Sequence, residues 1–305
     1  MELQQNQIMV RTCSTCGNCK NWMLLFLLLV STTVAIIYVI TQIILGEDGR
    51  STFHFKTGLY SLDDAALFDN TFLTWSTDLA ISATTGSFAY FMSTYDTNLA
   101  KLSCQFMFIY SASTALAGIL HYLHPSYDTS FQQQENPLNT KSFRWSWCVV
   151  VTLTSITASA QGRIANAILK QSTFWRVPDA FWNMHGLCTI FFYTVSTYLG
   201  YFSCHRPAAD IFIAGTSQCL CTFYLHYALY MNRKVWHPKQ MFYVWMLAIS
   251  LTTMAPALFL FPSLVVQTAL SMGEINVFLH TMIFMSWGLQ GYSLYKIIEI
   301  EDQTK

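Results

Sequence analysis

Two histidines three residues apart, His121 and His124, end an apolar segment just before Pro125. Residues at positions i and i+3 share one face of a helix, so both imidazoles can point the same way. Imidazole exchanges protons near neutral pH and also binds zinc through a ring nitrogen. The pair therefore raises two kinds of chemistry, proton exchange and metal binding, at the end of a predicted helix.

An aspartate and a third histidine fall at a similar depth in other apolar segments. Asp78 lies seven residues into one such segment, and His280 lies about five residues into another. At a rise of 1.5 Å per residue, these side chains and His121 lie roughly 6–10 Å from the same predicted end of their helices. A charged side chain inside a membrane helix costs about 2.5–3.5 kcal/mol on insertion scales, so it needs a reason to be there. We expect Asp78, His121 and His280 to form one polar site, and His124 to face lipid headgroups.

Three further polar side chains, Arg163, His185 and His226, lie toward the opposite end of the predicted helices. Asp179 opens the helix that carries His185. It can pair with Arg163 or His185, or simply interact with the helix N-terminus, where a carboxylate is favoured. We expect this second group to line the same route through the protein as the first.

Titratable groups near both ends of the helices favour passage of a small solute or of protons, because transporters use such groups as relays. A faint internal repeat points the same way: "FAYFMSTY" (Phe88–Tyr95) matches "FFYTVSTY" (Phe191–Tyr198) at five of eight positions. An inverted repeat of three helices is typical of secondary transporters, although chance similarity in a chain so rich in Phe, Tyr, Ser and Thr is the alternative. Glycines inside the apolar segments would allow close helix packing. They are Gly86, Gly118, Gly186, Gly200 and Gly215.

Other functions stay open beside transport. A membrane-embedded hydrolase would use zinc to activate water against a lipid ester or amide. Its ligands would come from His121, His124, His280 and Asp78. Bis-histidine haem, which ranks below zinc, would pair His121 with His280 and His185 with His226. A receptor or scaffold needs none of this chemistry, so the sequence leaves open whether the protein is an enzyme.

The composition explains why a membrane is invoked. The chain has 305 residues, of which 53% are hydrophobic and only 10% charged. A typical soluble domain has about 25% charged residues, and a chain this poor in charge could not cover its surface with polar groups. The excess apolar surface must therefore face lipid. The formal net charge is zero and no run of Lys or Arg occurs, so the sequence gives no support for nucleic-acid binding.

The predicted fold is an all-α, polytopic transmembrane bundle. A spanning helix needs roughly 20 mainly apolar residues, and eight segments qualify. They are about 22–45, 71–94, 103–124, 145–169, 178–203, 208–231, 240–262 and 275–297. With the N-terminus inside, eleven of the 16 Lys and Arg residues fall on the cytoplasmic side and five on the other. We therefore expect a cytoplasmic tail (1–21), a membrane domain (22–297) and a second cytoplasmic tail (298–305), in either the plasma membrane or an internal membrane.

Three cysteines, Cys13, Cys16 and Cys19, lie immediately before the first predicted span. Cysteines at this position on the cytoplasmic side are candidates for reversible palmitoylation. Zinc binding ranks last, because no nearby His or Cys supplies a fourth ligand. Acylation of a protein with eight spans would sort it or position its tail, since attachment is already secure.

Overall fold

The computed structural model describes residues 72–123, 141–169, 175–198, 218–267 and 272–304. These residues form helices and no strand, so the predicted all-α class is confirmed for this part of the chain. The seven helices are α4 (Phe72–Ser93), α5 (Asn98–Leu123), α6 (Lys141–Leu169), α7 (Asp179–Tyr198), α9 (Cys219–Met231), α10 (Pro238–Gln267) and α11 (Met272–Gln303).

Each of these helices coincides with one predicted span. Helix α9 begins at Cys219, and residues 208–217 of the corresponding predicted span lie outside the described residues. The first predicted span, the three juxtamembrane cysteines and His124 lie outside the described residues.

Within the described residues, α5 alone is long and apolar enough to cross a membrane by length and composition. The predicted count of eight spans is therefore not confirmed. Helices α4 and α6 are richer in Ser, Thr, Asn and Gln than α5, and many of these polar side chains are buried, whereas α9 is only 13 residues long. On α6 the buried polar residues are Ser155, Thr157, Ser159, Gln161 and Asn166.

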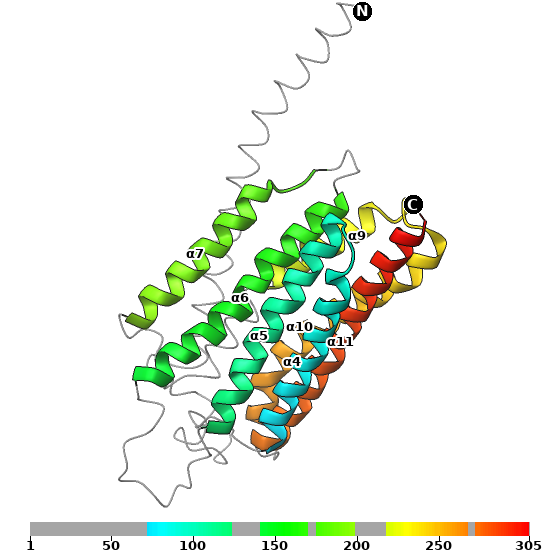
Figure 1. The fold of residues 1–305 in the computed structure, drawn as a ribbon. Coiled ribbons are helices and arrows are strands. Elements are labelled where there is room, and N and C mark those ends of the chain that lie inside the picture. Colours follow the sequence, from blue (N-terminus) through cyan, green and yellow to red (C-terminus); the bar gives the residue numbers. More distant parts are fainter. Residues whose placement is uncertain (1–71, 124–140, 170–174, 199–217, 268–271, 305) are drawn as a thin grey trace, which may run out of the picture.

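Six of the helices contact one another in a closed ring, and the seventh lies outside it. In order around the ring, α4 packs against α5, α5 against α6, α6 against α9, α9 against α10, α10 against α11, and α11 against α4. Helix α7 packs on the outer side of α6, at the flank of the bundle in Figure 1. Helices α5 and α11 also contact each other directly, and α4 packs against both of them.

Aromatic rings make the contact between α5 and α11. Trp287 of α11 stacks on Tyr110 of α5, with ring centroids 3.5 Å apart and an interplanar angle of 12°. Phe106, one turn away on α5, lies 4.9 Å from the same indole. Large buried rings of this kind contribute much apolar burial and hold the two helices in a fixed register.

Helices α4 and α5 approach each other closely. The Ser82 hydroxyl donates to the Ser111 carbonyl at 2.9 Å, and the Ser111 hydroxyl donates to the Ser82 carbonyl at 2.8 Å. A Cβ added at Gly86 would lie 3.0 Å from the Ser111 Oγ atom, so a larger residue would push the helices apart. Small residues that let helix backbones approach are typical of helix pairs in membranes.

Two glycines of α11 provide a matched test of this packing. A Cβ at Gly291 would lie 2.4 Å from the ring of Phe88 on α4, whereas a Cβ at Gly288 would meet nothing closer than Thr84 at 3.9 Å. We predict that Gly291→Ala lowers the free energy of unfolding by about 1–3 kcal/mol through overpacking, and that Gly288→Ala does not lower it. Thermal unfolding of the purified variants measures both. Equal melting temperatures for the two variants would contradict this account of the α4–α11 contact.

Candidate functional site

The site is centred on Asp78 of α4, at the point where α5 comes closest. A Cβ added at Gly118 of α5 would lie 3.1 Å from the Asp78 Cβ atom and 3.1 Å from the Trp75 carbonyl oxygen. Gly118 therefore lets α5 lie directly against the backbone turn that carries Asp78. His121 lies three residues further along α5, which is on the same helix face.

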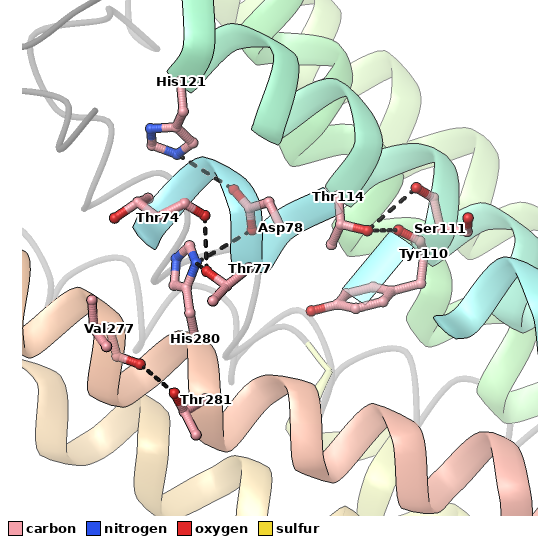
Figure 2. Close-up of polar contacts among 10 residues, drawn as sticks. All are labelled: Thr74, Thr77, Asp78, Tyr110, Ser111, Thr114, His121, Val277, His280 and Thr281. Carbon is pink, nitrogen blue, oxygen red and sulfur yellow. Dashed lines mark hydrogen bonds and ion pairs between the residues drawn. The ribbon is translucent and has the colours of Figure 1, made fainter. Parts of the chain in front are cut away.

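Figure 2 shows Asp78 between two histidines that come from two other helices. The Nε2 atom of His121 (α5) lies 3.8 Å from one carboxylate oxygen, Oδ2. The Nδ1 atom of His280 (α11) lies 3.4 Å from the other, Oδ1. Only 6% of Asp78 is exposed, and both histidine side chains are largely buried. The structure thus brings together the three residues that the sequence placed at one depth.

A threonine contact indicates which nitrogen of the His280 imidazole carries the hydrogen. The Thr77 hydroxyl donates to the Thr74 carbonyl at 2.8 Å. Its oxygen lies 3.0 Å from the Nδ1 atom of His280. With the hydroxyl hydrogen directed at Thr74, the Thr77 oxygen accepts from His280, and we therefore assign the imidazole hydrogen to Nδ1. The same N–H also faces the Oδ1 atom of Asp78.

The carboxylate is only partly satisfied. Its Oδ2 atom is buried and has no hydrogen-bond partner among the described residues. Burial removes the water that would otherwise solvate a carboxylate, and an unpaired buried charge is unfavourable. Charge balance is restored when an adjacent imidazole carries a proton or when Asp78 itself does. The cluster is therefore suited to gaining, losing and sharing protons.

The arrangement is less suited to a metal ion. Among the residues that the structure describes, no three His, Cys, Asp or Glu side chains are placed to hold one. The fourth proposed ligand, His124, lies outside the described residues.

The second group of predicted site residues does not join the first. His185 of α7 lies with its Nδ1 atom 2.7 Å from the Ser159 hydroxyl of α6. His226 of α9 has its Nδ1 atom 2.8 Å from the Thr222 carbonyl and its Nε2 atom 3.0 Å from the Ala248 carbonyl of α10. Both nitrogens of His226 are thus engaged with backbone, so the predicted haem pair of His185 with His226 has no geometric support.

Arg163 and Asp179 also find separate partners. Arg163 donates to the side-chain oxygen of Gln105 on α5, with a nitrogen–oxygen distance of 3.4 Å. Asp179, in the first turn of α7, accepts a 2.7 Å hydrogen bond from Asn166 of α6. Of the pairings considered from sequence, those with Arg163 and His185 are therefore wrong. The third possibility, that Asp179 lies at the N-terminus of its helix, is correct, because Asp179 is in the first turn of α7. Its hydrogen bond comes from an amide and not from a cation.

Several residues that shape these contacts were missed by sequence reasoning. Thr77 and Asn166 are ordinary polar residues of Ser/Thr-rich helices, and nothing in their spacing distinguishes them. Tyr224 of α9 donates to the side-chain Oδ1 atom of Asn166 at 2.5 Å and accepts from the backbone N–H of Val177 at 2.9 Å. These bonds depend on which helix faces which, and one sequence does not reveal that.

Comparison with protein-family models, with curated proteins and with solved structures gives no match for this chain. The geometry of the Asp78 site and the distribution of polar and apolar side chains are therefore the features that bear on function.

The orientation of His280 can be tested spectroscopically. We predict that ¹⁵N solid-state NMR of histidine-labelled protein shows a hydrogen-bearing Nδ1 for His280, with the signal identified by its loss in His280→Gln. Thr77→Val should move this signal, because the hydroxyl acceptor is removed. Thr281→Val should not move it, because the Thr281 hydroxyl bonds only within its own helix, to the Val277 carbonyl at 2.8 Å (Figure 2). A His280 Nδ1 without hydrogen would overturn the assignment.

Proposed function

We propose that the protein is a multi-pass integral membrane protein in which Asp78, His121 and His280 exchange protons during the passage of a proton or small solute. The bundle would cross the bilayer about eight times with both termini in the cytoplasm. The lipid bilayer is its expected surrounding, and the plasma membrane and internal membranes fit equally well.

The distribution of side chains supports the membrane part of this proposal. Large apolar side chains are exposed along the outer faces of the helices, which is unusual for a soluble monomer. Exposed examples are Phe108 of α5, Phe191 of α7, Phe223 of α9, Trp245 of α10 and Met285 of α11. The buried side instead holds many hydroxyl and amide groups. A helix with this pattern has a modest mean hydropathy, because its polar residues face other helices while its apolar residues face lipid.

The burial of Asp78 is the observation that supports proton exchange. An ionisable residue in the interior of a membrane bundle marks an ion or proton pathway by default. Here the carboxylate is buried between imidazoles from two other helices, and one of its oxygens lacks a hydrogen bond. A proton arriving at this oxygen would be bound by a carboxylate that already lies beside two imidazoles.

Proton binding at this position can also be coupled to helix movement. The three side chains belong to α4, α5 and α11, so the charge of the cluster sets the attraction between three helices. A change in that charge alters the balance between helix arrangements, which is the requirement for coupling a proton to a solute. The solute itself is not specified by the site.

Membrane residence is tested by extraction. We predict that the protein stays in the membrane pellet after washing with alkaline carbonate and is released only by detergent, because apolar helix faces are in contact with lipid. Immunoblotting of pellet and supernatant measures this. Release by carbonate alone would refute the membrane assignment.

Proton exchange is tested with purified protein in liposomes. Under a potassium diffusion potential, a pH-sensitive dye inside the liposomes reports proton entry. We predict that wild-type protein gives a flux above that of protein-free liposomes and that Asp78→Asn reduces it to that background level, because an amide cannot take up the proton.

Asp96→Asn is the matched control for this experiment. Asp96 lies in the turn between α4 and α5, is almost fully exposed, and pairs with Lys101 at 2.5 Å. The hydrogen bond from Lys101 and then its charge hold the pKa of Asp96 below the ordinary value, so the variant removes a carboxylate charge outside the site. The control should keep the wild-type flux. An undiminished flux in Asp78→Asn would remove Asp78 from the mechanism. In a separate measurement, about one equivalent of bound zinc by elemental analysis would favour the hydrolase in place of transport.

A further inference from the structure

The turn between α9 and α10 and the first residues of α10 carry three exposed cations, which we call the basic turn. Arg233, Lys234 and Lys239 are all exposed, and none of them forms an ion pair with a residue that the structure describes. By contrast, the exposed Lys101 at the start of α5 is paired with Asp96. The basic turn therefore holds positive charge that the described part of the protein does not compensate.

Buried amides hold the backbone at both ends of this turn. The backbone N–H and the side-chain amide of Asn232 both donate to the Ala228 carbonyl at 3.2 Å, and the Val235 N–H donates to the Asn232 carbonyl at 2.8 Å. The Gln240 side chain donates to the Ile297 carbonyl at 3.0 Å, which places the turn beside the C-terminal part of α11 (Figure 1). The backbone that carries the cations is therefore held in place.

Exposed apolar side chains continue from the basic turn along both helices. On α10 one helix face carries Lys239 and then three large exposed residues, which we call the apolar stripe. The members of the stripe are Phe242, Trp245 and Ile249. Counted from the lysine, the intervals are three, three and four residues, which keeps all four side chains on one face. On α9 the ring of Tyr230 is exposed, and the Arg233 guanidinium lies over it, 4.0 Å from the ring centroid.

The apolar stripe has the length of one half of a bilayer. From Lys239 to Ile249 the helix rises about 15 Å, and the hydrocarbon core of a bilayer is roughly 30 Å thick. A lipid whose headgroup lies at the cations would therefore have an acyl chain along the stripe. In the predicted orientation the basic turn faces the cytoplasm, and the cytoplasmic leaflet is the one that carries anionic lipids.

We propose that the basic turn binds the headgroup phosphate of an anionic membrane lipid of the phosphatidylserine type, with an acyl chain along the apolar stripe. Phosphate oxygens accept charge-assisted hydrogen bonds from guanidinium and ammonium groups, and cations next to a membrane span attract anionic lipids. The stripe favours a lipid over a soluble phosphate compound, because only a lipid has a chain to cover it. The inference depends on the membrane part of the proposed function and not on proton exchange.

Lipid preference can be measured on the purified full-length chain in detergent. Native mass spectrometry counts the phosphatidylserine and phosphatidylcholine molecules that the protein binds from an equimolar mixture. We expect the wild type to bind phosphatidylserine preferentially. The triple variant Arg233→Gln, Lys234→Gln and Lys239→Gln should lower that preference by roughly tenfold, because each cation near an anionic lipid favours binding several-fold. Equal binding of the two lipids by the wild type, or an unchanged preference in the triple variant, would overturn the proposal.

A charge-matched variant separates the basic turn from the net charge of the protein. Lys101→Gln, Lys141→Gln and Arg176→Gln together remove three exposed cations from other segments of the chain. This control variant should keep the wild-type preference for phosphatidylserine. A loss equal to that of the first triple variant would mean that net charge alone sets the preference, and the assignment to the turn would be wrong.

Soluble probes distinguish a bound lipid from its phosphate. Inorganic phosphate and a short-chain phosphatidylserine, each at the concentration of the long-chain lipid, should not displace it, because neither covers the apolar stripe. Displacement by either probe would overturn the proposed position of the acyl chain. Absence of lipid preference in a protein that resists carbonate extraction would refute this inference alone, whereas release by carbonate would refute the membrane assignment on which it depends.

Discussion

The close contact between α4 and α5 is the constraint on which the site depends. Two serines on these helices exchange hydrogen bonds with each other's backbone, and Gly118 allows the helices to touch at Asp78. Asp78 lies one turn from Ser82 on the same face of α4, so the serine pair fixes the direction in which the carboxylate points. If the helices were further apart, His121 would not reach Asp78, and only His280 would remain beside the buried charge.

The polar interior has a consequence for how the bundle is held together. If the bundle lies in lipid, as proposed, apolar burial gives little drive for helices to associate, so close packing and hydrogen bonds between helices become the specific contacts. The hydroxyl of Ser113 on α5, which donates to the Val150 carbonyl of α6, and the amide of Gln240 on α10, which donates to the Ile297 carbonyl of α11, are bonds of this kind. These bonds fix which helix faces meet, because each buried polar group needs its partner.

Depth could be predicted from the sequence, but direction around each helix could not. The length of the apolar segments places Asp78, His121 and His280 at one level. The structure places an imidazole nitrogen of each histidine within 3.8 Å of the Asp78 carboxylate. The same reasoning gave His185 and His226 a common level, yet they face different helix pairs. An all-α fold can be predicted from composition and segment length. The partner of each polar helix face depends on the order of the helices around the ring, and that order cannot be read from a single sequence.

The hydrogen bonds of His226 differ from the contacts at the proposed proton site. Both nitrogens of His226 lie within 3.0 Å of backbone oxygens from two helices, and the Thr252 hydroxyl lies at 3.1 Å from one of them. Any change at this imidazole would cost a contact that joins α9 to α10. At Asp78 the contacts are longer, 3.4 and 3.8 Å, and one oxygen has no hydrogen bond. Under the proposed function, a proton would enter or leave the Asp78 carboxylate without breaking a short hydrogen bond, because its Oδ2 atom has unused bonding capacity.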